Sequence, residues 1–578
     1  MTSPSTSSDR RLRTLYEKEW EWRVDQFADL TGLDILTGPD HVRFDRLPEV
    51  NGEAQQARQA RWTEVMVSLR SIDKETLSAA ERVNWDVYSA QIAALLEGQQ
   101  YGEFEAPANS DTAFWSEVAA VGRRRFGRLE DYEHWIAQMH DIPRFFRDMT
   151  EMMRRGLRRG FTPPRDSMKG REHSIRAVIE SQPEDTGFFR PFRAGKGISS
   201  RRARQLFKRA LKVITGQVQP SHAELLAFMQ DEYLPQCRET LSAEALPNGK
   251  QYYRAKVRHC TTLDSSVEEI HEFGLAEVAR LRRQMRQVLH EVRFGGSISD
   301  FLELLRKDPR FFAKSEDELM MRAAWIAKRF DGVASAYFGL LPRMRFAIVP
   351  VPDDIAPFYT SGRGAPGIYL LNTHRLGSRP LFNLPALTLH ESAPGHAFQF
   401  SLALENSLLP AFRRHAYLPA YAEGWALYCE RLGEEMGFYD TPYERFGMLG
   451  YQVWRAARLV VDTGLHAFGW SRARAVAYLA EQTSLSNHEI SAEVDRYVSW
   501  PAQALSYYLG GDVIWKARAH AERTLGAAFD IRQFHDEILS LGSVPLSVVR
   551  TSIEAAVSRR ASSARGADTS KTLGKRRR

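Results

Sequence analysis

The sequence contains few cysteines and no long apolar run. Its three cysteines, Cys237, Cys260 and Cys429, form no C-x-x-C pair. This scarcity argues against a disulfide framework and against a zinc site built from cysteines alone, and it fits a reducing compartment. A membrane-spanning helix would need about 18 uninterrupted apolar residues, which no segment offers. The N-terminal MTSPSTSSDRRLR lacks the apolar stretch of a secretory signal, so we expect a cytoplasmic protein without a membrane partner.

The chain also lacks an excess of charge outside its C-terminal end. The formal net charge is +7, and residues 558–578, SRRASSARGADTSKTLGKRRR, hold eight Lys or Arg against one Asp. The rest of the chain is therefore formally neutral, so a nucleic-acid partner is not expected. We predict that 558–578 is a disordered basic tail, with an electrostatic tether to an anionic partner as the alternative.

What the sequence does have is an amphipathic helical pattern over most of its length. Residues 268–292 repeat apolar side chains at intervals of three and four, with charges between them, which predicts a helix. Two short runs, 345–352 and 366–373, are β-branched or aromatic and are bounded by Pro, Gly and Asn. We therefore predict a mainly α fold with a small β element just before the histidine motif considered below.

Loop-like stretches indicate where the chain divides. Residues 159–170 and 191–202 are rich in Pro, Gly and Arg and interrupt the helical pattern. We place a boundary there, with an N-terminal helical part over 1–160 and a second helical part over 161–557. With 43% hydrophobic residues the chain can bury a large core, and the two parts are expected to form one intertwined fold.

The segment TLHESAPGHAFQF, residues 388–400, interrupts a zinc-hydrolase signature. The signature H-E-x-x-H needs a histidine four residues after His390, but Pro394 stands there and the next histidine is His396. On a regular helix, residues six apart differ by about 120° and about 9 Å, too far for two nitrogens each about 2.1 Å from one zinc. Pro394 and Gly395 are suited to a bulge that would bring His396 back. The alternative is a helix end with two incidental histidines.

A third ligand candidate follows in an acidic helical stretch, LPAYAEGWALYCERLGEE, residues 418–435. A catalytic zinc takes three protein ligands and keeps one position open, and two His with one Glu form a standard set. Glu423 lies twenty-seven residues after His396, enough for one helix to end and a second to return a carboxylate. The pattern predicts Zn²⁺ bound by His390, His396 and Glu423.

These motifs resemble the bacterial family called domain of unknown function 885. That family carries the motifs H-E-x-x-P-G-H-x-x-Q, E-G-W-A and R-Y-x-x-x-P-G-Q-A-x-x-Y-K-x-G. This chain has HESAPGHAFQ, AEGWALYCERLG and, over 493–510, EVDRYVSWPAQALSYYLG. Earlier segments such as GPDHVRFDRLPE are also similar, so the resemblance covers most of the chain. In the last motif Ala502 replaces a glycine, which is a minor steric change, and Tyr508 replaces a lysine, which removes a cation able to meet a substrate carboxylate.

The family is similar to helical zinc peptidases of the thimet oligopeptidase and thermophilic carboxypeptidase type. The resemblance implies a mainly helical, cleft-forming metallopeptidase that cleaves an amide bond in short peptides or peptide-like molecules, trimming a terminus. Glu391 is expected to take the proton of a zinc-activated water and pass it to the leaving amine. The alternatives are a metal-dependent lyase or cyclisation enzyme of small-molecule biosynthesis, and a binding protein without catalysis. The oligomeric state stays open.

Further site residues are expected around the last motif. Tyr507 and His466 are candidates for stabilising an oxyanion, and a core aromatic is the alternative for Tyr507. Arg458 could also form a buried structural pair with Asp462. The strand over Gly367 to Leu371 is expected to lie at a sheet edge, where a peptide main chain can pair with it. The residues expected to bind substrate are Arg496, Gln503, Tyr497, Arg458 and Tyr369.

Overall fold

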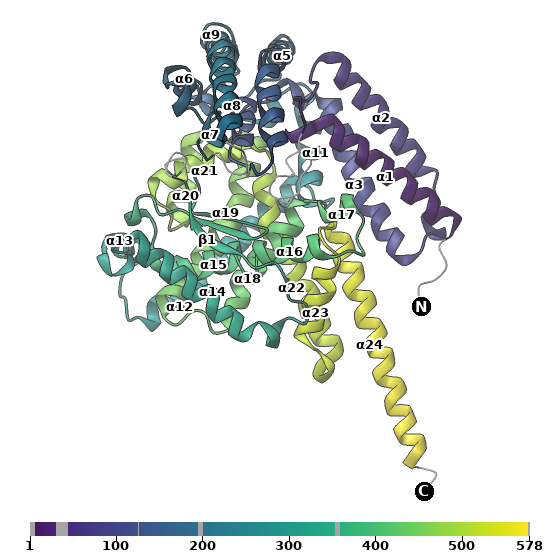
Figure 1. Cartoon of the computed structure of the whole chain (residues 1–578). Coiled ribbons are helices and arrows are strands. Elements are labelled where there is room, and N and C mark those ends of the chain that lie inside the picture. The colour runs from purple at the N-terminus through teal and green to yellow at the C-terminus, as the bar shows by residue number, and fades with distance from the viewer. Residues whose placement is uncertain are drawn as a thin grey trace. The chain divides into compact units, whose positions relative to one another are not determined.

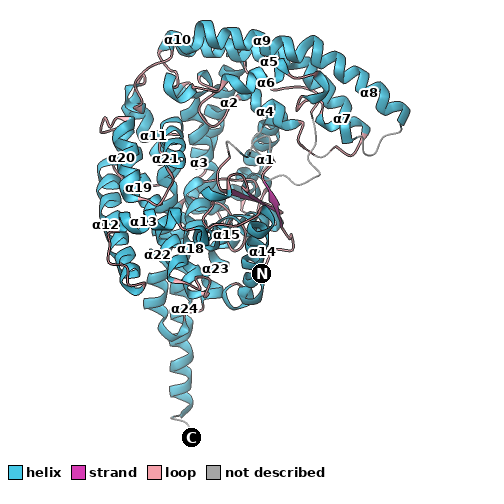
Figure 2. Cartoon of the chain, turned by 90° about the vertical axis from the view of Figure 1, so that its left-hand side faces the viewer, coloured by secondary structure: helices cyan, strands magenta, loops and turns pink. Residues whose placement is uncertain are grey.

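Helices make up most of the chain in the computed structural model (Figure 2). The residues that the structure describes are 6–30, 44–124, 126–194, 200–352, 356 and 359–575. The chain divides into two compact units, one of Met1–Ala255 with Val498–Trp500 and one of Lys256–Tyr497 with Pro501–Arg578. The predicted mainly α fold is confirmed.

The first unit is helical around an aromatic core. Its α-helices are α1 (Ser7–Phe27), α2 (Gly52–Arg70), α3 (Ala79–Tyr101), α4 (Phe114–Val121), α5 (Leu129–Arg159), α6 (Glu172–Glu180), α7 (Arg190–Ala194), α8 (Ser200–Val213), α9 (Gln219–Ala227), α10 (Leu234–Gln236) and α11 (Gly249–Thr261), which runs across the division. Trp135 on α5 stacks on Phe188 with ring centroids 5.8 Å apart and donates to the carbonyl oxygen of Phe188 at 2.9 Å.

The division of the chain falls after residue 255, whereas the sequence placed it near residue 160. The reason is that α5, which precedes the predicted boundary, packs against α8 and α9, which follow it. The loop-rich stretches 159–170 and 191–202 therefore belong to the first unit. Within the second stretch, residues 195–199 lie outside the described residues.

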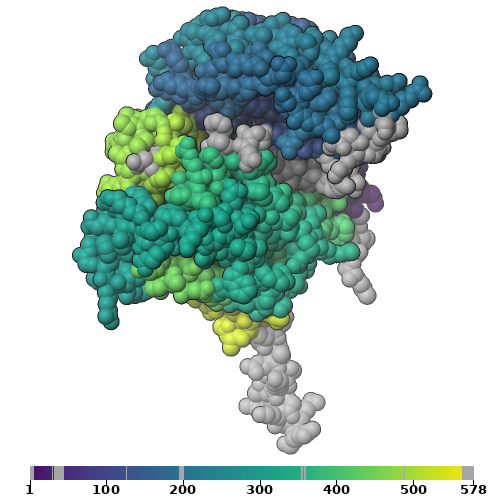
Figure 3. Space-filling model, turned by 60° about the vertical axis from the view of Figure 1, so that its left-hand side comes forward, coloured from purple at the N-terminus to yellow at the C-terminus, as the bar shows by residue number. Residues whose placement is uncertain are grey.

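The second unit holds a three-stranded sheet among helices. Its α-helices are α12 (Val267–Glu291), α13 (Ile298–Lys307), α14 (Glu316–Tyr337), α15 (Leu384–Glu391), α16 (His396–Glu405), α17 (Ala411–Arg414), α18 (Pro419–Glu435), α19 (Pro442–His466), α20 (Arg472–Gln482), α21 (Asn487–Ser499), α22 (Ser506–Leu525), α23 (Ile531–Ser540) and α24 (Leu546–Lys575). Figure 1 shows α15, α16 and α18 close to the sheet, and Figure 3 shows α13 and α14 on the surface in teal.

The sheet corrects one prediction. Its strands are β1 (Ala347–Pro350), β2 (Gly362–Ala365) and β3 (Ile368–Leu371), in the order β1-β3-β2. The strand expected at an edge, β3, is central: it runs parallel to β1 and antiparallel to β2. A peptide therefore cannot add to β3, because both of its edges are occupied.

Strand β2 was not predicted, because its sequence Gly-Arg-Gly-Ala lacks the β-branched and aromatic residues that strands favour. The turn that joins it to β3 has the chemistry of a tight hairpin. Pro366 and Gly367 occupy the two central positions, and Gly367 takes a φ of +75°. These residues suit a type II turn, in which the second central residue has a positive φ.

The helices α18 and α22 approach each other through two glycines. A Cβ on Gly424 would lie 2.4 Å from the carbonyl carbon of Gly510, and a Cβ on Gly510 would lie 1.9 Å from the carbonyl oxygen of Ala420. Only glycine leaves room for such a contact between backbones. Because α18 carries Glu423 and α22 carries Tyr507, this crossing brings together two helices that bear predicted site residues.

The C-terminal helix α24 extends into the segment expected to be disordered. Its backbone is helical to Lys575, and the Ala, Arg and Lys residues of this segment have high helix propensity. The remaining residues of the expected tail, 576–578, lie outside the described residues. Among the described helices, none combines the length and the apolar composition needed to cross a bilayer.

The glycine crossing can be tested by adding one methyl group. Gly424→Ala should lower the free energy of unfolding by about 1–3 kcal/mol, because the methyl group overpacks the contact. Gly332→Ala is the matched control: Gly332 is exposed on α14 with no neighbour near an added Cβ, so alanine should stabilise the chain by about 1 kcal/mol through helix propensity. Urea unfolding measures both. A Gly424→Ala variant as stable as the parent would contradict the backbone contact.

Candidate metal centre

A break between α15 and α16 separates the two motif histidines. Helix α15 ends at Glu391 and α16 begins at His396. In the break, the N–H of Gly395 donates to the carbonyl oxygen of Leu389 at 3.0 Å, and a Cβ on Gly395 would lie 1.9 Å from the carbonyl oxygen of His390. The indole N–H of Trp425 on α18 donates to the carbonyl oxygen of Pro394 at 2.8 Å. The predicted bulge is thus a complete helix break, and the hydrogen bond from Trp425 connects it to α18.

The break brings both histidines to one carboxylate oxygen. Oε2 of Glu423 lies 3.6 Å from Nε2 of His390 and 3.3 Å from Nε2 of His396. All three side chains are buried. Ligands that each lie about 2.1 Å from a tetrahedral zinc are about 3.4 Å from one another. The three predicted ligands therefore have donor atoms that suit zinc, and the two distances from Glu423 fit ligands of one ion.

Glu391 belongs to the same cluster but is held differently. One ligand atom from each of His390, Glu391 and His396 lies within 4.8 Å of the others. Oε2 of Glu391 accepts a hydrogen bond from the backbone N–H of Gly364 on β2 at 2.6 Å. Glu391 is held by a hydrogen bond from the sheet, whereas a single oxygen of Glu423 faces both Nε2 atoms. Glu423 therefore fits the position of a ligand, and Glu391 fits a position beside the ligands.

Glu430 is a further member of the site that the sequence did not predict. Its Oε1 lies 2.8 Å from Nδ1 of His390, and its Oε2 accepts from Gln452 at 3.1 Å. A carboxylate accepts only, so Nδ1 carries a proton, and Nε2 is the nitrogen that would bind a metal. The available signal was spacing: Glu430 follows Glu423 by seven residues, two turns along the same helix face.

The buried carboxylates favour positive charge at the cluster. Burial by itself lowers the pKa of His390, but Glu423, Glu430 and Glu391 outweigh it and raise that pKa to about 10. Burial raises the pKa of Glu423, but His396 and His390 outweigh it and hold that pKa well below its ordinary value. The carboxylates therefore favour positive charge on His390, and the histidines favour the charged form of Glu423.

Three predicted residues of the last motif lie together beside the histidines. Arg496 donates to Oε1 of Gln503 at 3.2 Å and to the hydroxyl of Tyr507 at 3.3 Å. The ring of Tyr507 is 5% exposed and lies nearly parallel to that of His390, with centroids 6.5 Å apart. The structure thus places Tyr507 beside His390, with Arg496 next to Tyr507 and Gln503 next to Arg496.

Four other predicted residues are buried and engaged with the protein itself. Nε2 of His466 lies 2.9 Å from the carbonyl oxygen of Tyr497, to which it donates. The hydroxyl of Tyr497 accepts from Nε of Arg458 at 3.0 Å, and Arg458 pairs with Glu493 at 2.8 Å. Tyr369 lies on the central strand with no exposed surface. The structure therefore shows His466, Tyr497 and Arg458 in contacts within the protein, and Tyr369 buried in the sheet.

The two departures from the family motif have structural consequences. Ala502 takes a φ of +68°, a left-handed conformation that glycine adopts without steric cost, so the change constrains the backbone more than a minor steric change would. Asp462, considered above as a partner of Arg458, accepts from the N–H of Ala502 at 3.1 Å. The hydroxyl of Tyr508 donates to Glu277 on α12 at 2.6 Å, so this side chain is engaged with α12.

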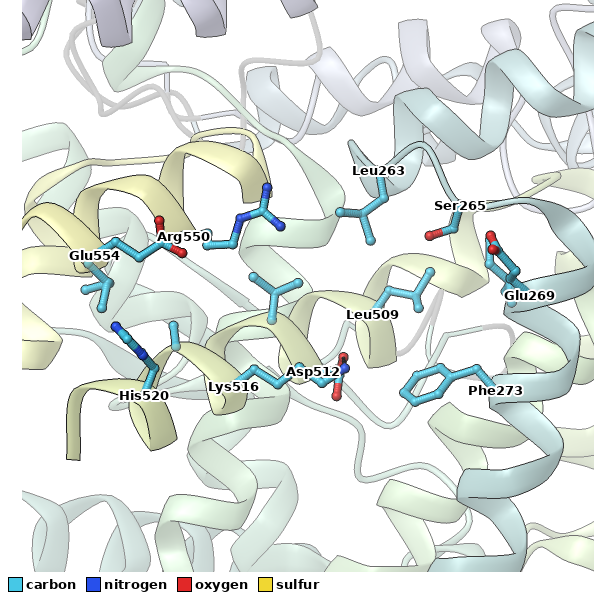
Figure 4. Close-up of a pocket in the computed structure, with 14 residues that line it drawn as sticks. Leu263, Ser265, Glu269, Phe273, Leu509, Asp512, Lys516, His520, Arg550 and Glu554 are labelled. Atoms are coloured by element: carbon cyan, nitrogen blue, oxygen red, sulfur yellow. Dashed lines mark ion pairs between the residues drawn. The ribbon is translucent and has the colours of Figure 1, made fainter. Parts of the chain in front are cut away.

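A groove of about 690 Å³ lies elsewhere in the second unit (Figure 4). Helices α12, α22 and α24 line it, with Phe273, Asp512 and Arg550 among the side chains that face it. No residue of the histidine cluster is among the described residues that line this groove. The cleft expected at the histidine motif stays a prediction.

Fold and site together define a mainly helical protein with a buried cluster of histidines and carboxylates. The chain matches, over residues 31–553, the family described as bacterial protein of unknown function (DUF885), and it belongs to that family. A search of the curated proteins found no match.

Two solved structures share the fold. The crystal structure of a putative lipoprotein from Colwellia psychrerythraea is 23% identical and has a TM-score of 0.87, with 96% of this chain and 100% of that chain covered. A putative lipoprotein of unknown function from Shewanella oneidensis is 17% identical and has a TM-score of 0.68, with 95% and 99% covered. The likeness to zinc peptidases and the cytoplasmic location stay predictions.

The helix break gives a test that does not depend on activity. Gly395→Ala would push a methyl group into the carbonyl oxygens of His390 and Leu389, so we expect a loss of about 1–3 kcal/mol or more in the free energy of unfolding. Gly377→Ala is the control, because Gly377 is exposed and no atom lies within 4 Å of an added Cβ. Denaturant unfolding of both variants measures the difference. Equal stability would show that the break tolerates a side chain.

Proposed function

We propose that the protein is a zinc-dependent hydrolase that cleaves an amide bond in short peptides or peptide-like molecules. The observation that carries this proposal is the position of Glu423, whose Oε2 faces Nε2 of both His390 and His396 at separations that fit a tetrahedral ion. Two His with one Glu is a ligand set of hydrolytic zinc enzymes, and it leaves a fourth position for the reaction.

Glu391 is the proposed general base. A zinc ion bound at this site supplies Lewis acidity, which lowers the pKa of a water and polarises a carbonyl group. The N–H of Gly364 holds Oε2 of Glu391 at 2.6 Å, which fixes the direction of the carboxylate. Its other oxygen can then take a proton from water and return it to the leaving amine. Glu430 accepts a hydrogen bond from Nδ1 of His390, the ring nitrogen that does not face Glu423, and so orients the ring.

Tyr507 is the proposed donor to the oxyanion that forms when water adds to the carbonyl. Its hydroxyl oxygen accepts a hydrogen bond from Arg496 at 3.3 Å, which leaves the O–H proton available to donate. The guanidinium of Arg458 lies over the Tyr507 ring at 4.3 Å and helps to fix the position of the ring. A donor held in place before the reaction costs no reorganisation in the transition state.

Metal content tests the ligand assignment. The purified protein should hold about one zinc, and His396→Ala should lose most of it, because two ligands cannot match the affinity of three. His488→Ala is the control, since His488 is exposed on α21. Elemental analysis after dialysis measures the metal in each. Full zinc retention by His396→Ala would rule out His396 as a ligand.

Turnover separates catalysis from metal binding. Glu391→Gln keeps the shape of the side chain but cannot accept a proton, so zinc should remain while turnover of a responsive peptide falls by about 10²–10⁴-fold. Tyr507→Phe should lower kcat with little change in KM. Glu268→Gln, on the exposed face of α12, should leave turnover unchanged.

The substrate for these kinetics comes from a library of short peptides, incubated with and without a chelator and read by mass spectrometry. Parental turnover by Glu391→Gln would reject the hydrolytic mechanism, and a lyase or cyclisation reaction would then be the better explanation.

A further inference from the structure

Tyr417 touches the proposed metal site, although no sequence motif indicated it. It lies in the loop between α17 and α18, and its hydroxyl donates to Oε1 of Glu423 at 3.0 Å. Its ring packs against Phe400, which stacks on His396 with ring centroids 5.2 Å apart and planes inclined by only 2°. Tyr417 therefore contacts one proposed ligand directly and reaches another through one aromatic ring.

The two oxygens of Glu423 have different partners. Oε2 faces Nε2 of both histidines, at 3.3 and 3.6 Å, while Oε1 accepts the hydrogen bond from Tyr417. A tyrosine hydroxyl is protonated at neutral pH, so it donates here. A carboxylate with one oxygen occupied in this way presents only the other oxygen to a metal.

This division of roles matters for the coordination number. A catalytic zinc needs three protein ligand atoms and one open position. If nothing held Oε1 of Glu423, both oxygens of the carboxylate could turn toward the ion. With a water also bound, the second oxygen would make the ion five-coordinate and take the position that a substrate carbonyl would otherwise use. The hydrogen bond from Tyr417 opposes that rotation, since rotation would break it.

We propose that Tyr417 is a positioning residue that holds Glu423 as a one-oxygen ligand and so keeps one coordination position of the metal open. The inference rests on the proposed function, because it requires the metal. Glu430 similarly positions His390 through a hydrogen bond, but Glu430 and Tyr417 differ in their exposure to solvent. Glu430 is fully buried, whereas Tyr417 is 47% exposed.

Removing a single hydroxyl group tests the proposal. Tyr417→Phe keeps the ring and its packing on Phe400 but frees Oε1 of Glu423. The matched control is Tyr508→Phe, which removes a tyrosine hydrogen bond to Oε2 of Glu277 on α12, a carboxylate outside the histidine cluster that Arg280 also contacts. Both variants and the parent are loaded with cobalt(II), and their visible absorption is recorded, because four-coordinate cobalt absorbs more strongly than five-coordinate cobalt. Zinc affinity by chelator competition and peptide turnover are measured on the same samples.

The expected result is a weaker visible band in Tyr417→Phe, with metal still bound and turnover reduced by about 10–100-fold, while Tyr508→Phe matches the parent. If the parent and Tyr417→Phe bind cobalt with the same spectrum, Tyr417 does not position Glu423. A fall in turnover with an unchanged spectrum would mean that the hydroxyl acts on the substrate instead. If the parent itself binds neither cobalt nor zinc, the proposed function is wrong and this inference falls with it. Equal spectra would reject only the role of Tyr417, whereas a parent without metal would also reject the proposed metal site.

Discussion

The backbone contact of Gly395 with the carbonyl oxygen of His390 is the constraint from which the rest of the site follows. It ends one helix and starts another within a segment where a continuous helix would have turned the two histidines apart. Trp425 fastens this break to α18, and Glu423, two residues earlier on the same helix, then faces both histidines. Gly424, between them, forms the contact with α22. Three consecutive residues of α18 thus contact the helix break, the two histidines and the helix that carries Tyr507.

Buried negative charge would make folding of the same segment unfavourable unless a cation compensated it. Glu391, Glu423 and Glu430 surround His390 in a place that excludes most water. A buried charge without a partner costs several kcal/mol, so protons or a metal ion must compensate these carboxylates. The unfolded chain does not hold these side chains together, so a metal ion bound by them would add its binding free energy to the stability of the fold.

The sequence predicted the features that depend on local pattern. The apolar spacing of 268–292 matches α12, and the motif spacing gave His390, His396 and Glu423, which the fold brings together. Features that depend on contacts distant in sequence were harder to predict. The edge position expected for β3 was wrong, because β3 also pairs with β2, a glycine-rich strand with no β signal. Helices that pack across the loops set the division after residue 255. Tyr417 and Glu430 carry no motif of their own, since their roles come from hydrogen bonds to ligands.

The glycine contact between α18 and α22 also limits how the site can move. Where two backbones touch, there is no layer of side chains whose rotamers could rearrange, so the two helices cannot slide past each other without a clash. We expect α18 and α22 to move as one rigid body. Glu423 and Gly510 then keep a fixed separation. Motion at the histidine cluster must in that case come from loops that join rigid elements, such as the one that carries Tyr417.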